Sequence, residues 1–145
     1  MREYLSVYVT APSFDVAQTI GRTLVEERLA ACVNIISEMR SIYRWAGNIE
    51  TAAEVVLISK SWTALFEEIE KRVRELHPYD CACLVAWPIE AGHQPYLDWI
   101  ARRRPGELNN RGSKDPSPMP RFEFLRRGAL PAGHNCVTAV ASPPT

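Results

Sequence analysis

The sequence predicts an α+β domain whose strands and helices follow the order β-α-β-β-α-β, with a short helix at the end. Three observations predict this class. Short runs rich in Val, Ile, Tyr and Thr recur along residues 1–102. Between them lie two stretches whose apolar residues repeat every three or four positions, as on one face of a helix. Proline and glycine close most of these segments.

The first half of the pattern is a strand followed by a helix. Residues 4–10 (YLSVYVT) form a β-rich run that Pro12 closes. Ser13 can cap a following helix by accepting a hydrogen bond from the first turn. Apolar residues at every fourth position then predict an amphipathic helix over residues 14–29.

A long hairpin comes next. Residues 32–36 and 41–45 are β-rich, and residues 46–48 (Ala-Gly-Asn) are a turn signal. The apolar run that follows ends at Lys60. The sequence therefore predicts a hairpin over residues 32–60.

The second half repeats the helix and the strand. Apolar residues of period 3.6 begin at Trp62 and predict a second helix that ends before Pro78. Residues 81–87 predict a fourth strand, and Pro95 opens a short helix through Ile100. The charged outer face of the second helix is expected to be solvated.

This order is the split βαβ arrangement of the ferredoxin-like fold, in which both helices cover one face of the sheet. The strands are apolar on both faces, as in residues 55–58 (VVLI) and 84–87 (LVAW). One face would remain exposed to water in a two-layer fold, so oligomerisation is expected.

Composition changes near residue 102. Residues 1–102 carry 10 Lys and Arg against 14 Asp and Glu, whereas residues 103–145 carry 7 against 3 and hold 7 of the 11 prolines. The second segment has too few large apolar residues to bury a core. The sequence predicts one folded domain, residues 1–102, and a Pro-rich, disordered C-terminal tail, residues 103–145.

Formal net charge is zero, which gives no electrostatic argument for nucleic acid or a membrane surface. No segment has the roughly 20 apolar residues that a membrane span needs. Cys81 and Cys83 are too close along a strand to form an easy disulfide, so free thiols and a cytoplasmic location are expected.

Four motifs resemble the CutA family of divalent-cation (copper) tolerance proteins. They are residues 24–35 (LVEERLAACVNI), 41–50 (SIYRWAGNIE), 77–80 (HPYD) and 96–100 (YLDWI). The resemblance implies a ferredoxin-like protomer in a compact homotrimer, built like the PII signalling proteins. It also implies a role in tolerance of copper and other divalent cations, without an organic cofactor. Nothing in residues 103–145 resembles the family.

A metal site is the sharpest functional hypothesis. Cys81 and Cys83 would point to one face of the predicted strand, with His77 four residues upstream across a turn. Thiolates favour Cu(I) or Zn²⁺, and imidazole suits Cu(II) or Zn²⁺. The alternative is that both cysteines pack as small apolar residues. Cys32 is expected in the core, and Cys136 is given no role.

A second candidate site is a polar and aromatic set that lines a cleft between subunits in the resembling family. A lysine that ends an apolar strand needs water or a carboxylate, which Glu54 or Asp80 could supply. The set is either an intersubunit ion pair with aromatic packing or a pocket for a small anionic ligand, as in a PII-like regulatory module. Its members are Tyr43, Trp45, Glu54, Lys60, Tyr79 and Asp80.

No enzyme is expected, because the sequence lacks a phosphate-binding loop and the G-x-S-x-G and H-E-x-x-H motifs. The fold hosts an acyl-phosphate hydrolase that uses an arginine and an asparagine, for which Arg28 and Asn34 are available. No anion-binding loop precedes the first helix, however. A third alternative is a structural trimer that holds an unknown protein partner through the tail.

Overall fold

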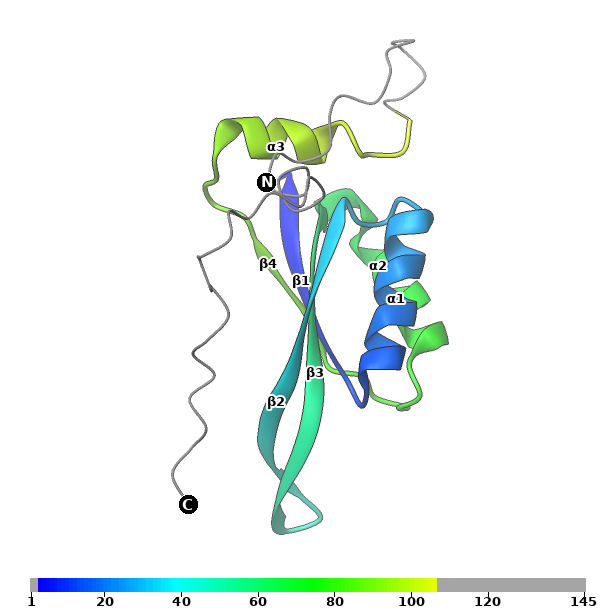
Figure 1. Ribbon diagram of the computed structural model, residues 1–145, viewed down its shortest axis with the longest axis vertical. Helices are drawn as coiled ribbons and strands as arrows, with labels where there is room; N and C mark the ends of the chain where they lie inside the picture. The colour runs from blue at the N-terminus through cyan, green and yellow to red at the C-terminus, as the bar shows by residue number, and fades with distance from the viewer. Residues whose placement is uncertain (1–2, 107–145) are drawn as a thin grey trace, which may run out of the picture. The chain divides into compact units, whose positions relative to one another are not determined.

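The structure, a computed structural model, describes residues 3–106. Its elements follow the predicted β-α-β-β-α-β order, and a third α-helix comes last (Figure 1). The predicted tail lies outside the described residues from position 107 onward, as does Cys136. The elements are β1 (Tyr4–Ala11), α1 (Phe14–Glu26), β2 (Cys32–Trp45), β3 (Asn48–Trp62), a 3₁₀ turn η1 (Thr63–Leu65), α2 (Phe66–Leu76), β4 (Leu84–Pro88) and α3 (Gln94–Ala101).

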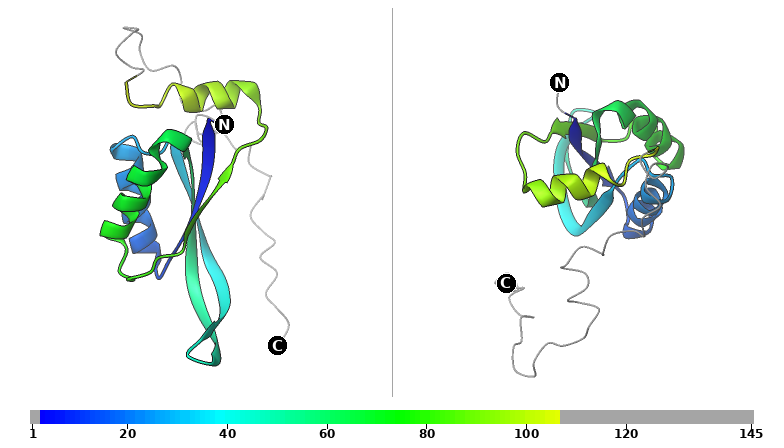
Figure 2. Two further views of the ribbon diagram at one scale, coloured as in Figure 1. Left: turned by 180° about the vertical axis from the view of Figure 1, so that it is seen from behind. Right: turned by 90° about the horizontal axis from the view of Figure 1, so that it is seen from above.

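The four strands form one antiparallel sheet in the order β2-β3-β1-β4. Helices α1 and α2 lie side by side on one face of it, as both views of Figure 2 show. This arrangement confirms the ferredoxin-like fold. No helix within residues 3–106 is long and apolar enough to cross a bilayer.

The main core lies between the helices and the sheet. Strand alternation directs Val7, Val9 and Leu57 toward the helices, where they are fully buried against Ile20 and Ile69. Each fully buried side chain of this size contributes roughly 1.5–3 kcal/mol through removal from water. These residues fix the sheet against the two helices.

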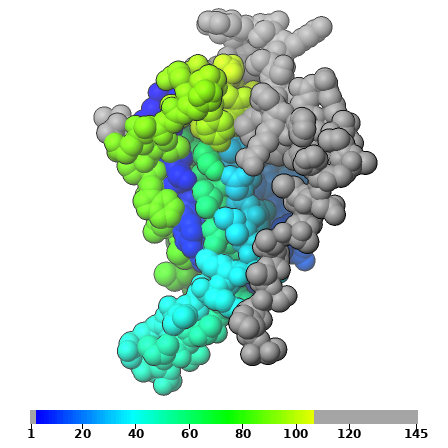
Figure 3. Space-filling model, turned by 60° about the vertical axis from the view of Figure 1, so that its left-hand side comes forward, coloured from blue at the N-terminus to red at the C-terminus, as the bar shows by residue number. Residues whose placement is uncertain are grey.

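On the opposite face, which we call the open face, α3 at one end of the sheet is the only helix within residues 3–106. Figure 3 looks onto it. Trp87 and Val85 on β4 and Ile36 on β2 are about half exposed there. Tyr8 on β1 packs edge-on against Trp87, with ring centroids 5.5 Å apart. The open face thus exposes apolar side chains within the described residues, as the two-sided strand pattern predicts.

The hairpin of β2 and β3 extends beyond the ends of β1 and β4 (Figure 1). Ala46 and Gly47 both have positive φ, 47° and 83°, as a two-residue type I′ turn requires. The register shifts between Ile36 and Met39, where Glu38 has a φ of 64°. The structure confirms the predicted hairpin and adds this β-bulge.

Helix α1 ends at Glu26, three residues earlier than predicted. Arg28 takes a left-handed conformation with φ 60°, and its N–H donates to the Val25 carbonyl. The N–H of Leu29 donates to the Leu24 carbonyl, which completes a Schellman motif. The apolar periodicity runs on to Leu29 because that side chain packs into the core after the helix has ended.

Trp62 was predicted to begin the second helix, but it is the last residue of β3. Its indole is fully buried in a second cluster, with Ala31 and Ile100, and α3 packs there across the end of the sheet (Figure 1). Residues 63–65 form a 3₁₀ turn before α2 begins at Phe66. Sequence spacing alone could not separate a strand end from a helix start here.

Candidate functional site

The loop between α2 and β4 carries both cysteines of the predicted metal site. Strand β4 begins at Leu84, so Cys81 and Cys83 lie in the loop before it and not in the strand as predicted. Both are free thiols, and both are exposed. Within residues 3–106 neither thiol is covered, and the alternative that the two cysteines pack as small apolar residues stays a prediction.

His77 begins this loop and is itself buried, with 7% of its surface exposed. Its Nδ1 accepts a hydrogen bond from the Tyr79 N–H at 3.1 Å, and its Nε2 lies 2.7 Å from the Thr10 carbonyl. A carbonyl can only accept, so Nε2 carries the proton and donates. Neither ring nitrogen is free for a metal in this arrangement.

Within residues 3–106, no three His, Cys, Asp or Glu side chains gather closely enough to hold a metal ion. The three predicted ligands, His77, Cys81 and Cys83, therefore do not form a closed site in one protomer. What the loop offers is a pair of exposed thiols two residues apart. Such a pair supplies two soft ligands and leaves any further ligand to come from elsewhere.

The predicted cleft residues divide between the two ends of the sheet in one protomer. Six residues separate Glu54 from Lys60 along β3, or about 20 Å at 3.3 Å per residue. Glu54 instead accepts a short hydrogen bond from the Ser41 hydroxyl, and Lys60 Nζ donates to the Asn34 amide oxygen at 2.6 Å. Glu54 is therefore not the partner of Lys60 in the same protomer.

The other four members lie toward the end of the sheet that holds Glu54. Tyr43 and Trp45 stand on the hairpin beyond it, and Trp45 is 70% exposed. Tyr79 and Asp80 are exposed on the loop after His77, where the Tyr79 and His77 rings lie 5.0 Å apart. These aromatic side chains are thus largely exposed in the part of the chain that the structure describes.

Lys60 belongs to a group of side chains that sequence reasoning did not bring together. Cys32 is its neighbour across the β2–β3 ladder, and the Cys32 thiol lies 3.3 Å from the Tyr96 hydroxyl. Cys32 is half-buried at this edge, not in the core as predicted. Burial raises the pKa of the Tyr96 phenol, and the hydrogen bond with Cys32 raises it further. Tyr96 therefore stays protonated at neutral pH.

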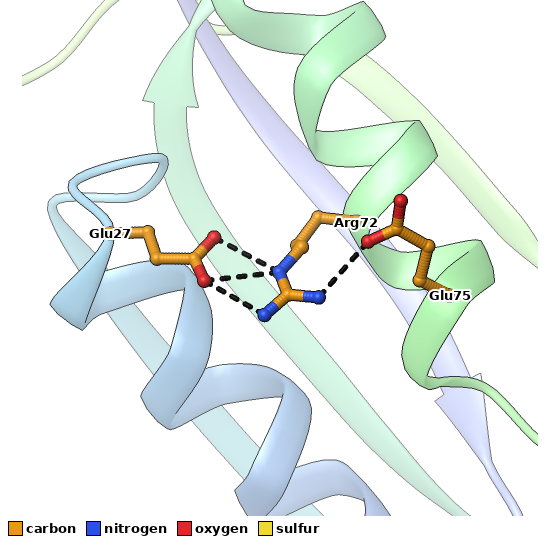
Figure 4. Close-up of polar contacts among 3 residues, drawn as sticks. All are labelled: Glu27, Arg72 and Glu75. Carbon is orange, nitrogen blue, oxygen red and sulfur yellow. Dashed lines mark hydrogen bonds and ion pairs between the residues drawn. The ribbon is translucent and has the colours of Figure 1, made fainter.

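An ion-pair cluster ties the two helices together on the outer face (Figure 4). The Arg72 guanidinium contacts both carboxylate oxygens of Glu27 at 2.9–3.0 Å and reaches Glu75 at 3.0 Å. The Glu27 hydrogen bonds, and then those to Glu75, raise the pKa of Arg72. A depression of about 290 Å³ beside it is also lined by Leu29, Glu68 and Lys71. Helical spacing predicted only solvation here, because Glu27 lies 45 residues away in the sequence.

Comparisons with known proteins agree with this architecture. The family of the CutA1 divalent ion tolerance protein matches residues 5–103. A divalent-cation tolerance protein CutA from Thermus thermophilus is 49% identical over 94 residues, which cover 65% of this chain and 91% of the relative. The mouse and human CutA proteins are 44% identical over 95 residues. The chain spans about half the length of these two mammalian relatives.

Solved structures are similar over the same region. The Thermus thermophilus divalent cation tolerance protein has a TM-score of 0.68 at 46% identity, covering 70% of this chain and 98% of its own. CutA1 from Oryza sativa has a TM-score of 0.70 at 33% identity, covering 72% and 96%. The match spans both β-α-β halves and the four motifs noted in the sequence. The chain therefore belongs to the CutA1 divalent ion tolerance family.

Proposed function

We propose that this chain contributes to divalent-cation tolerance by binding a thiophilic transition-metal ion, with copper as the first choice, on Cys81 and Cys83. The observation that carries the proposal is the pair of exposed free thiols on one short loop. Thiolate is the side-chain ligand that most strongly favours Cu(I). A solvent-exposed position gives a metal ion direct access to both sulfurs.

Two thiolates suit an ion that accepts low coordination. Zn²⁺ in protein sites takes four ligands, so the loop alone would leave two positions to water or to a second protomer. We therefore expect the loop to prefer Cu(I) over Zn²⁺ and to bind weakly. The family name concerns divalent cations, and Cu(I) would form from Cu(II) by one-electron reduction by a low-molecular-weight cellular thiol before it reaches this site.

A homotrimer is the second part of the proposal. The open face exposes Ile36, Val85 and Trp87, and the hairpin exposes Ile42, Trp45 and Ile49. Apolar patches of this kind on soluble proteins mark contact surfaces. Two further copies of the chain, as the resemblance implies, would cover the open face and the hairpin. Light scattering of the purified full chain checks the proposed mass.

The proposed location is the cytoplasm, where exposed thiols stay reduced. An Archaeoglobus fulgidus relative, 40% identical, is described as periplasmic. The cellular location of this chain should therefore be measured directly. Cell fractionation with thiol labelling would decide between a reduced cytoplasmic protein and an oxidised exported one. We propose a binding role and no catalytic one.

The decisive experiment is an anaerobic Cu(I) titration of the full chain against a competing chelator. The wild type is compared with Cys81→Ser/Cys83→Ser and with Cys32→Ser, a matched loss of one thiol outside the loop. Cu(I) binding lost only in the double variant would support the loop site. Equal binding in all three proteins would remove Cys81 and Cys83 from the proposal.

The second candidate function is binding of a small anionic ligand by a PII-like module. The observation that favours it is Lys60, whose ammonium group donates to the neutral Asn34 amide. A cation placed there can attract an anion that enters between subunits. Lys60→Ala should abolish binding of the anion and leave Cu(I) binding unchanged, whereas Cys81→Ser/Cys83→Ser should do the reverse. Isothermal titration with nucleotides and simple phosphates provides the measurement.

A further inference from the structure

The loop that carries Cys81 and Cys83 is fastened at both ends to one residue of β1. At its start, the His77 imidazole donates to the Thr10 carbonyl across 2.7 Å. At its end, the Thr10 N–H donates to the Cys83 carbonyl across 3.2 Å. Thr10 itself is buried, with 7% exposed. The seven residues 77–83 therefore form a closed loop on a rigid central strand.

His77 also sets the point at which β4 begins. The β1–β4 register pairs Val9 with Leu84, so Thr10 and Cys83 would form the next pair of the ladder. The bond from the Thr10 N–H to the Cys83 carbonyl marks this as a hydrogen-bonded position of the ladder, at which the two residues ordinarily exchange both N–H···O bonds. Here the Thr10 carbonyl accepts from the imidazole in the position that the Cys83 N–H would take. Strand β4 therefore begins at Leu84, while Cys83 keeps one backbone bond to β1 and an exposed thiol.

The imidazole holds the loop from inside as well. Its Nδ1 accepts from the Tyr79 N–H, which fixes the direction of the chain immediately after Pro78. The His77 N–H caps the end of α2 by donating to the Val73 carbonyl at 2.8 Å. One buried side chain thus joins the helix end, the loop and β1.

We infer that His77 is the positioning residue for the Cys81/Cys83 pair and not a ligand of the metal. The inference rests on the proposed thiolate function. An open loop would have to order itself before both sulfurs could reach one ion, and the affinity would fall by that ordering cost. Groups that orient metal ligands typically change metal affinity ten- to a hundred-fold when they are replaced.

Two substitutions separate the contacts of the imidazole. In His77→Asn, the short amide can still accept from the Tyr79 N–H, as in an Asx turn, but cannot reach the Thr10 carbonyl. In His77→Gln, the longer amide can still donate toward Thr10 but loses the acceptor next to Tyr79. His93→Asn is the matched control, because His93 is an exposed histidine whose side chain makes no capping bond.

The experiment measures the Cu(I) dissociation constant of the full chain by chelator competition in these variants, alongside amide hydrogen exchange and X-ray absorption. We expect His77→Asn and His77→Gln to weaken Cu(I) binding by about ten-fold or more, with a larger effect when both contacts are removed in His77→Ala. Exchange of the Tyr79 amide should accelerate in His77→Gln and not in His77→Asn. His93→Asn should match the wild type in every readout.

X-ray absorption of the copper-loaded wild type should give sulfur neighbours without imidazole nitrogen. A nitrogen neighbour that disappears in His77→Asn would overturn the inference, because His77 would then be a ligand. Unchanged Cu(I) affinity in both variants, with wild-type binding intact, would overturn it as well. Absence of Cys81- and Cys83-dependent binding in the wild type would instead refute the proposed function, on which the inference rests.

Discussion

Two serines on β3 should respond to the same substitution with opposite signs. Ser59 and Ser61 are both fully buried and point toward the helices from positions two residues apart. The Ser61 hydroxyl donates to the Leu29 carbonyl, which ties the end of the α1 region to β3. Among residues 3–106, the Ser59 hydroxyl finds no hydrogen-bond partner. The prediction is that Ser59→Ala stabilises the protein and Ser61→Ala destabilises it.

The magnitudes follow from these contacts. An unpaired buried hydroxyl costs roughly 1–3 kcal/mol, so its removal should raise the free energy of unfolding by about 1 kcal/mol after the small loss of packing. Ser61→Ala strips the donor from a buried carbonyl and should cost about 1–2 kcal/mol. The two variants should therefore differ by about 2–3 kcal/mol, which corresponds to roughly 8–12 °C in Tm at about 4 °C per kcal/mol for a domain of this size.

Guanidinium unfolding followed by circular dichroism measures the difference. Protomer concentration must be equal in all samples, because association stabilises the folded state by mass action. Light scattering should give the same assembly for the wild type and both variants, and the denaturant slope should be unchanged. Equal destabilisation by both substitutions would refute the reasoning, since it would mean that the Ser59 hydroxyl has a favourable partner.

Two further predictions concern the ends of α1 and of the sheet. Arg28→Gly should raise the free energy of unfolding by about 0.5–1 kcal/mol, because glycine takes the left-handed φ of 60° without strain. Arg22→Gly, in the exposed interior of α1, should lower it by about 1 kcal/mol. Chemical unfolding measures both variants, and a lower free energy of unfolding in Arg28→Gly would contradict the Schellman assignment. The raised pKa of Tyr96 predicts that stability is fully present below pH 10 and falls as the pH rises above it, because the phenol ionises first in the unfolded chain. Tyr96→Phe should reduce that alkaline loss, and an unchanged slope of stability against pH would exclude Tyr96 as its source.

The parts of the fold that follow local rules could be predicted from the sequence. The Ser13 hydroxyl accepts from the Val16 N–H at 3.3 Å, as an N-cap should, and Pro95 lies in the first turn of α3. The turn at Ala46 and Gly47 lies where the sequence placed it. Each of these features depends on the backbone preference of a few adjacent residues.

The parts that depend on distant contacts could not be predicted. The partner of Lys60 is Asn34, which lies diagonally across the β2–β3 ladder from it, and not a carboxylate nearer in the sequence. The late start of β4, at Leu84, accompanies a hydrogen bond between His77 and Thr10, which are 67 residues apart. Spacing along the chain contains no information about which buried carbonyl a side chain will reach. The motif likewise does not show that both ring nitrogens of His77 are already hydrogen-bonded.

The β-bulge in β2 changes whether even- or odd-numbered residues of that strand lie on the open face. Before it, even-numbered residues such as Asn34 pair with the open-face residues of β3; after it, odd-numbered ones such as Tyr43 and Trp45 do. The Tyr8 hydroxyl donates to the Met39 sulfur at 3.4 Å, because the bulge places Met39 on the open face. Removal of one residue at Glu38 would restore regular alternation and leave Tyr43 and Trp45 opposite Glu50 and Asn48. The extra residue therefore sets the bend and twist of the hairpin and not the identity of its open-face residues, so a relative with one residue fewer there would present the same side chains at a different angle.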